Sequence, residues 1–105
     1  MEALVALCTV PNEQVAEELA ETLVQNRLAA CVNIVGPHKS VYEWDGKLER
    51  DTEFLLIIKT SRGRFEALAE KVLQIHPYEV PEIIALPVLA GNAAYLDWVK
   101  KQTDS

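Results

Sequence analysis

A chain of 105 residues has room for one domain, 1–105, and little space for a second. Its 16 acidic and 10 basic residues give a net charge of -6, which disfavours binding to a nucleic-acid backbone. The apolar runs are too short to span a membrane and no signal peptide is visible, so we expect a cytoplasmic protein that binds neither nucleic acid nor membrane.

The chain begins with a pattern typical of a buried strand followed by a helix. Residues 3–10 are apolar on both faces and end at Pro11. Asn12 can cap the following helix, whose apolar residues recur at one-face spacing as far as residue 23. We therefore expect a strand and an amphipathic helix.

A long hairpin is predicted next. The strand pattern over 28–44 is interrupted by Gly36-Pro37, as expected for a bulge or bend. Asp45-Gly46 is a strong signal for a tight hairpin turn, and 47–60 returns as the third strand.

The remaining elements are a helix, a strand and a last helix. Ser61 can cap the second helix, and His76-Pro77 ends it because proline disfavours helix in the residue before it. A fourth strand over 81–89 contains Pro87, which favours an edge position. Gly91-Asn92 opens a short C-terminal helix. The order is βαββαβ plus a helix, which predicts an α+β, ferredoxin-like antiparallel sheet with both main helices on one face.

Both faces of this sheet are apolar, which a monomer does not explain. Phe54, Leu56 and Ile58 point to one side of their strand, whereas Leu55 and Ile57 point to the other. Because the two main helices cover one face, the opposite face needs a partner. This pattern indicates an oligomer and leaves the number of subunits open.

The length of the hairpin gives a second argument for a partner. A strand of 14 residues spans roughly 45 Å, whereas a domain of about 100 residues is roughly 35 Å across. The hairpin, with Tyr42, Trp44 and Leu48, therefore projects from the domain or folds back on its own sheet through a bend at Gly36-Pro37. We favour the projecting hairpin, received by another subunit.

Cys8 and His76 are the candidate metal ligands. Thiolate and imidazole suit copper or zinc, and the thiolate favours Cu(I). The alternatives are a small core cysteine and a histidine that ends a helix. Two ligands are too few for a closed site, so we expect no tightly bound cofactor and at most weak binding of copper or another divalent cation.

The loop after the second helix is a candidate ligand cleft. Tyr78, Glu79 and Glu82 bring hydrogen-bonding groups to a segment that two prolines stiffen, and Lys59 ends an apolar strand that could reach it. The alternative is a loop that only routes the chain. A catalytic role for Cys8 with a histidine base lacks any accompanying motif, so we expect a binding protein rather than an enzyme.

Several segments together resemble the CutA divalent-cation-tolerance family. They are CTVP (8–11), LAACVNI (28–34), SVYEWDGK (40–47), IKT (58–60), HPYEVPEII (76–84) and YLDW (95–98). The resemblance implies a ferredoxin-like fold, a homotrimer with interlocked sheets, and a cytoplasmic role in tolerance of divalent metals, chiefly copper. It implies copper ligands at Cys8 and His76, although Ile75 stands where some members have a second histidine. The trimer is also similar to the PII signalling proteins, which implies as an alternative a regulator that binds a small anionic ligand or a protein between subunits.

Overall fold

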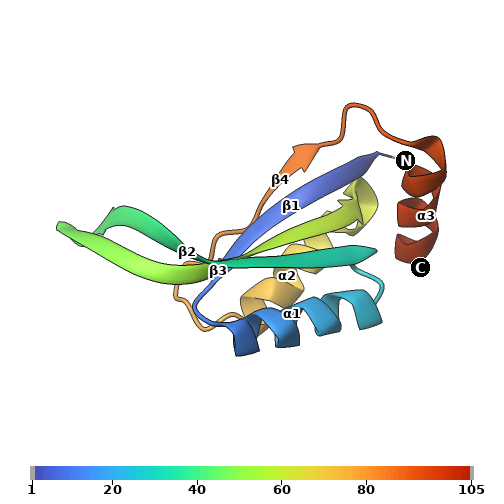
Figure 1. Cartoon of the computed structure of the whole chain (residues 1–105). Coiled ribbons are helices and arrows are strands. Elements are labelled where there is room, and N and C mark those ends of the chain that lie inside the picture. The colour runs from blue at the N-terminus through green and yellow to red at the C-terminus, as the bar shows by residue number, and fades with distance from the viewer. Residues whose placement is uncertain (1, 105) are drawn as a thin grey trace.

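A four-stranded antiparallel sheet organises the computed structural model, which describes residues 2–104 (Figure 1). The strand order is β2-β3-β1-β4. The elements are β1 (Ala3–Val10), α1 (Glu13–Gln25), β2 (Cys31–Trp44), β3 (Lys47–Ser61), the 3₁₀ turn η1 (Arg62–Arg64), α2 (Phe65–Ile75), β4 (Ile84–Pro87) and α3 (Ala93–Thr103). The α+β class and the predicted order of elements are confirmed. None of the helices within 2–104 has the length and apolar character needed to cross a bilayer.

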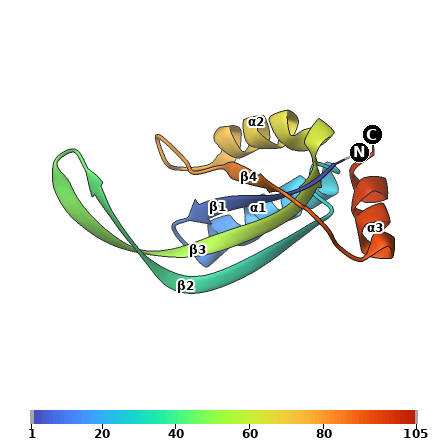
Figure 2. The same cartoon turned by 90° about the horizontal axis from the view of Figure 1, so that it is seen from above.

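The core lies between the sheet and the two longer helices. α1 and α2 lie side by side on one face, while α3 lies at the end of the sheet where β1 begins (Figures 1 and 2). Asn12 caps α1 as predicted, since its side-chain oxygen accepts a hydrogen bond from the Val15 N–H at 2.8 Å. Most of the largest fully buried apolar side chains come from these two helices and the two central strands, and α3 adds Val99: Leu19, Leu23, Leu56, Ile58, Leu68, Val10, Val72 and Val99.

Two predicted details are wrong: the start of the second strand and the capping role of Ser61. Both depend on hydrogen bonds to residues that are distant in sequence. The second strand starts at Cys31 rather than residue 28, since Leu28 turns into the core and its carbonyl accepts a hydrogen bond from the buried Thr60 hydroxyl at 2.6 Å. Ser61 does not cap a helix, because η1 intervenes and the Ser61 oxygen accepts a hydrogen bond from the Thr103 hydroxyl. The fourth strand lies at the edge as predicted, although it is shorter than expected.

The hairpin of β2 and β3 projects beyond the body of the domain (Figure 2). β1 pairs with β3 only as far as Phe54, so residues 38–53 form a two-stranded ribbon without a third strand, which we call the arm. The domain is 45 Å in its longest dimension against 26 and 21 Å in the others. Asp45 and Gly46 both have positive φ, at 56° and 79°, as a type I′ turn requires. The predicted turn and the projection are confirmed.

A β-bulge separates the arm from the sheet. The pairing register shifts between Val35 and His38, so β2 carries one more residue than β3 at this point. Gly36 has a φ of 149°, and a Cβ there would lie 2.9 Å from Cδ2 of Phe54, so only glycine fits without a shift. After the bulge, His38 lies opposite Glu53.

The face of the sheet opposite α1 and α2 carries exposed apolar side chains. In β1 the even-numbered residues are buried under the helices, so the odd-numbered residues and their partners face the other way. Ile84 and Leu86, which pair with Leu7 and Val5, are about half exposed. Nothing within residues 2–104 covers them, so the expectation of an apolar second face is confirmed.

Candidate functional site

A cavity of about 500 Å³ lies between the arm and the loop that joins α2 to β4. The residues that surround it come from three segments that are distant in sequence. Its polar and aromatic lining consists of Thr9 from β1, Ser40, Tyr42, Trp44 and Glu53 from the arm, and Tyr78, Glu79 and Glu82 from the loop. Volumes of this size are typical of small-molecule sites.

The bulge determines which side of the arm faces this cavity. Successive side chains of a strand alternate between faces, so Ser40, Tyr42 and Trp44 share a side with His38. Glu53, opposite His38, lies on the same side. Without the extra residue in β2, these three side chains would point away from Glu53.

Glu53 is the most buried charged side chain of this lining, with 5% of its surface exposed. One carboxylate oxygen, Oε2, accepts a hydrogen bond from the Tyr78 hydroxyl at 2.6 Å. Burial, followed by this hydrogen bond and the Glu53 charge, raises the pKa of Tyr78. On the arm, the Tyr42 hydroxyl donates to Asp51 Oδ2. The tyrosines are therefore neutral donors that orient acidic groups.

The predicted cleft residues do not all meet within one chain. Tyr78, Glu79 and Glu82 line the cavity, whereas Lys59 does not. Lys59 pairs with Val5 in β1, four residues before Thr9 and about 13 Å away at 3.3 Å per residue. Its ammonium group donates to Asn33 Oδ1 on the open face of the sheet. A cleft that combines Lys59 with the loop across two subunits stays a prediction.

His76, at the C-terminal end of α2, links this helix to the end of β1. Its ring is 7% exposed, packs against the Tyr78 ring with centroids 4.7 Å apart, and places Nε2 at 2.7 Å from the Thr9 carbonyl oxygen. The Tyr78 N–H lies 3.1 Å from Nδ1 and can only donate to it. Nδ1 is therefore the acceptor and Nε2 carries the proton, so both ring nitrogens have protein partners.

Cys8 precedes the Thr9 carbonyl that His76 contacts. Its side chain is fully buried among core residues, and its Sγ lies 3.8 Å from the Thr9 carbonyl oxygen. Burial, together with the charges of Glu82 and Glu53, raises the pKa of the Cys8 thiol to about 12.

The chain brings the two predicted metal ligands to one end of β1 but does not preform a closed site. Within residues 2–104 no three His, Cys, Asp or Glu side chains are grouped so as to hold a metal ion. Copper would have to displace the Cys8 proton and a hydrogen bond of His76, and would need a further donor from water or another subunit. Metal binding by Cys8 and His76 stays a prediction.

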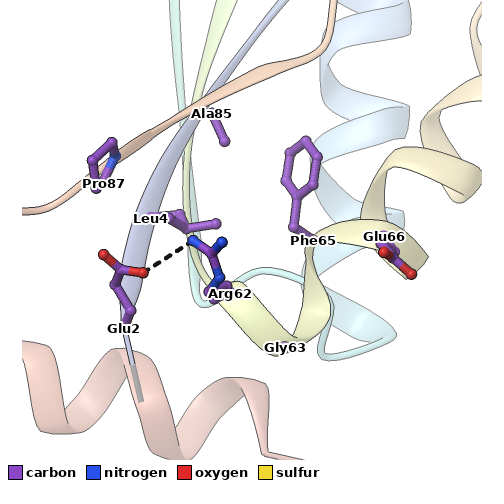
Figure 3. Close-up of a pocket in the computed structure, with 8 residues that line it drawn as sticks. All are labelled: Glu2, Leu4, Arg62, Gly63, Phe65, Glu66, Ala85 and Pro87. Carbon is purple, nitrogen blue, oxygen red and sulfur yellow. Dashed lines mark hydrogen bonds and ion pairs between the residues drawn. The ribbon is translucent and has the colours of Figure 1, made fainter.

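A second hollow, of about 570 Å³, lies beside the start of β1 and contains none of the predicted site residues (Figure 3). Figure 3 shows the ion pair between Arg62 and Glu2, 3.1 Å apart, at its rim. Both side chains are well exposed, so the pair contributes little to stability.

Residues 4–102 match the family described as CutA1 divalent ion tolerance protein. The divalent-cation tolerance protein CutA of Thermus thermophilus is 52% identical over 99 residues, which cover 94% of this chain and 96% of that protein. Protein CutA of Mus musculus is 53% identical over 100 residues, which cover 95% of this chain but only 56% of the mouse protein. The crystal structure of CutA1 from Oryza sativa superposes with a TM-score of 0.97 at 47% identity, covering 99% of this chain and 95% of that chain.

The names of these relatives refer to tolerance or give no function, and none of them states a catalytic activity. They do not agree on a compartment. A relative from Arabidopsis thaliana, 50% identical, is named chloroplastic, and a structure from Archaeoglobus fulgidus, 37% identical, is named periplasmic. Cytoplasmic location of this chain therefore stays a prediction.

Proposed function

Because this chain belongs to the CutA1 divalent ion tolerance family, we propose that it acts in tolerance of divalent cations, chiefly copper, as a homotrimer that binds metal without turnover. The observation that carries the tolerance role is the match to this family over residues 4–102, together with 52% identity to a relative named for the same role.

Apolar surface that one chain leaves uncovered supports the assembly. Trp44 and Leu48 on the arm are 52% and 61% exposed, and Ile84 and Leu86 on the open face of the sheet are similarly exposed. Exposed apolar residues on a two-stranded ribbon favour aggregation unless a partner covers them. A neighbouring copy of the chain, which receives the arm, satisfies both surfaces.

Cys8 provides the soft thiolate ligand of the copper ion, and His76 provides the second protein ligand. A thiolate selects Cu(I), and the nearby Glu53 and Glu82 carboxylates, which retain the thiol proton, also favour a bound cation. Two protein donors give weak binding, so water or a donor from another subunit completes the coordination.

A growth assay tests the tolerance role. Cells that lack their own family member are grown with increasing copper, with or without this chain. We expect the wild-type chain to restore growth at elevated copper and Cys8→Ser to fail at equal expression. Cys31→Ser is the matched control, because it removes a thiol outside the proposed site. Full restoration by Cys8→Ser would contradict the proposed metal ligand, and failure of the wild-type chain would contradict the tolerance role.

Sedimentation equilibrium tests the assembly separately. Three chains of 11.7 kDa give a species of about 35 kDa. A well-folded species near 12 kDa at micromolar concentration would exclude the homotrimer.

A further inference from the structure

The cavity between the arm and the α2–β4 loop has a charge and shape that suit a ligand other than the proposed copper ion. Its lining includes the carboxylates of Glu53, Glu79 and Glu82, and no lysine or arginine of the described residues takes part. A small anion would therefore meet three negative charges and no positive one. The electrostatics of this cavity favour a cation.

The carboxylates of the described residues do not form a ready site for a bare metal ion. A metal needs several donors within about 2.0–2.6 Å of one point. No three acidic, histidine or cysteine side chains within residues 2–104 converge in this way. The same groups around a cavity of about 500 Å³ suit a larger cation, whose charge and body lie several ångströms apart.

Glu53 supplies the strongest anchor for such a cation. Its side chain is more than nine-tenths buried and borders the cavity, and Tyr78 occupies Oε2. No hydrogen bond or ion pair from the rest of residues 2–104 reaches Oε1. A carboxylate oxygen that has no protein donor and is not sealed from solvent can accept a hydrogen bond from a charged N–H group.

Aromatic side chains form the remaining wall. Tyr42 and Trp44 line the cavity from the arm, and Tyr78 lines it from the loop. Aromatic faces attract cations, tryptophan most strongly, and they also cover apolar groups. A lining that combines carboxylates with aromatic rings matches an amine with an apolar or aromatic body.

We propose that this cavity binds a small organic ammonium compound, with the ammonium group on Glu53 Oε1 and the apolar body against Trp44 and the tyrosines. The cavity adjoins the Cys8–His76 pair through Thr9 and Tyr78, but neither Cys8 nor His76 lines it, so amine binding is measured on protein without added copper. Its ligand has the opposite charge to the anion expected for this loop, because Lys59 of the same chain does not line the cavity.

Phenethylamine tests the proposal, with 3-phenylpropionate as its anionic counterpart and 2-phenylethanol as its neutral one. The full chain carries Trp98→Phe, which leaves Trp44 as the single tryptophan reporter. We expect saturable binding of phenethylamine by calorimetry and by Trp44 fluorescence, with a dissociation constant of about 1 mM or lower. The carboxylate and the alcohol bind at least tenfold more weakly.

Glu53→Gln keeps the shape of the side chain and removes its charge. We expect it to weaken phenethylamine binding about tenfold or more, as the loss of a charged hydrogen bond does. Glu66→Gln, the same change at the other hollow, leaves binding within about twofold. If circular dichroism shows that Glu53→Gln is unfolded, Glu82→Gln tests the proposal instead. Glu82 is exposed, so we expect this variant to fold and to weaken phenethylamine binding by a smaller factor.

Three results would overturn the proposal. They are equal or tighter binding of 3-phenylpropionate, unchanged amine affinity in folded Glu53→Gln or Glu82→Gln, and no saturable amine binding up to about 10 mM. The last result is the one expected if a basic side chain of a second copy fills the cavity.

Discussion

The Cys8 thiol of the folded chain should react very slowly with alkylating reagents. Cys31→Ser leaves Cys8 as the only cysteine. Burial and the two nearby glutamates raise its pKa from 9.0 to about 12. At pH 8 the thiolate fraction is then about a thousandfold lower than for an ordinary thiol, and the alkylation rate by iodoacetamide falls at least as much, because only the thiolate reacts.

Mass spectrometry of the alkylated chain measures this rate against the same variant unfolded in urea. We expect the folded rate to rise about tenfold per pH unit from pH 8 to 10 without levelling off. Cys8→Ser, which retains the partly exposed Cys31, is the control for reagent activity. A folded rate within about tenfold of the unfolded rate at pH 8, or a plateau near pH 9, would refute the reasoning.

The same shift predicts how stability depends on pH. The unfolded chain releases the thiol proton near pH 9, whereas the folded chain holds it to about pH 12. The contribution of this group is therefore complete below pH 9 and is lost as the pH rises towards 12. At pH 10 the loss is about 1.4 kcal/mol of unfolding free energy, measurable by denaturant titration of wild type against Cys8→Ala.

Other changes should act on stability, assembly and metal binding. Thr60→Val should lower the unfolding free energy by about 1–3 kcal/mol in denaturant titration, because the buried Leu28 carbonyl loses its donor; a loss below about 0.5 kcal/mol would contradict this. Trp44→Ala should lower trimer stability by about 3–5 kcal/mol in concentration-dependent unfolding, and a loss under about 1 kcal/mol would show that no neighbour covers the ring. Cys8→Ser and His76→Ala should each weaken Cu(I) binding in competition with a chelator while the fold persists. The Cu(I) affinity of the wild-type chain should fall about tenfold per pH unit on acidification. Unchanged Cu(I) affinity in both variants would place copper elsewhere.

The parts of the fold that local chemistry determines could be predicted from the sequence. Asn12 and Asn92 accept hydrogen bonds from the N–H groups of their own helices, and Asp45-Gly46 adopts the turn that its positive φ angles require. Ser61 could not be assigned, because its hydroxyl binds Thr103, and nothing near Ser61 in sequence reveals that partner.

For the site, the density of polar groups in the loop after α2 indicates a cleft, but it does not reveal the residues that face the loop. The sequence does not single out Glu53, because a glutamate on a projecting ribbon resembles any solvated strand residue. Its burial depends on Tyr78, 25 residues away. The clue in the sequence was Gly36-Pro37, since a bulge there determines which arm residues share a side with Glu53. The position of Lys59 depends on the register of β1 and β3, which pairs it with Val5 and so places it along the sheet, away from the loop of the same chain.

Because of the bulge between Val35 and His38, the number of residues in β2 determines which side chains of the arm face the cavity. Insertions or deletions of two residues within one strand of the arm leave the same sides facing in and out, whereas a single residue lost at the bulge inverts that strand. Val41 and Glu43 would then take the places of Ser40 and Tyr42 beside Glu53. In related chains, we therefore expect each strand of the arm to change in length by an even number of residues beyond Gly36. We also expect the extra residue of the bulge to be retained.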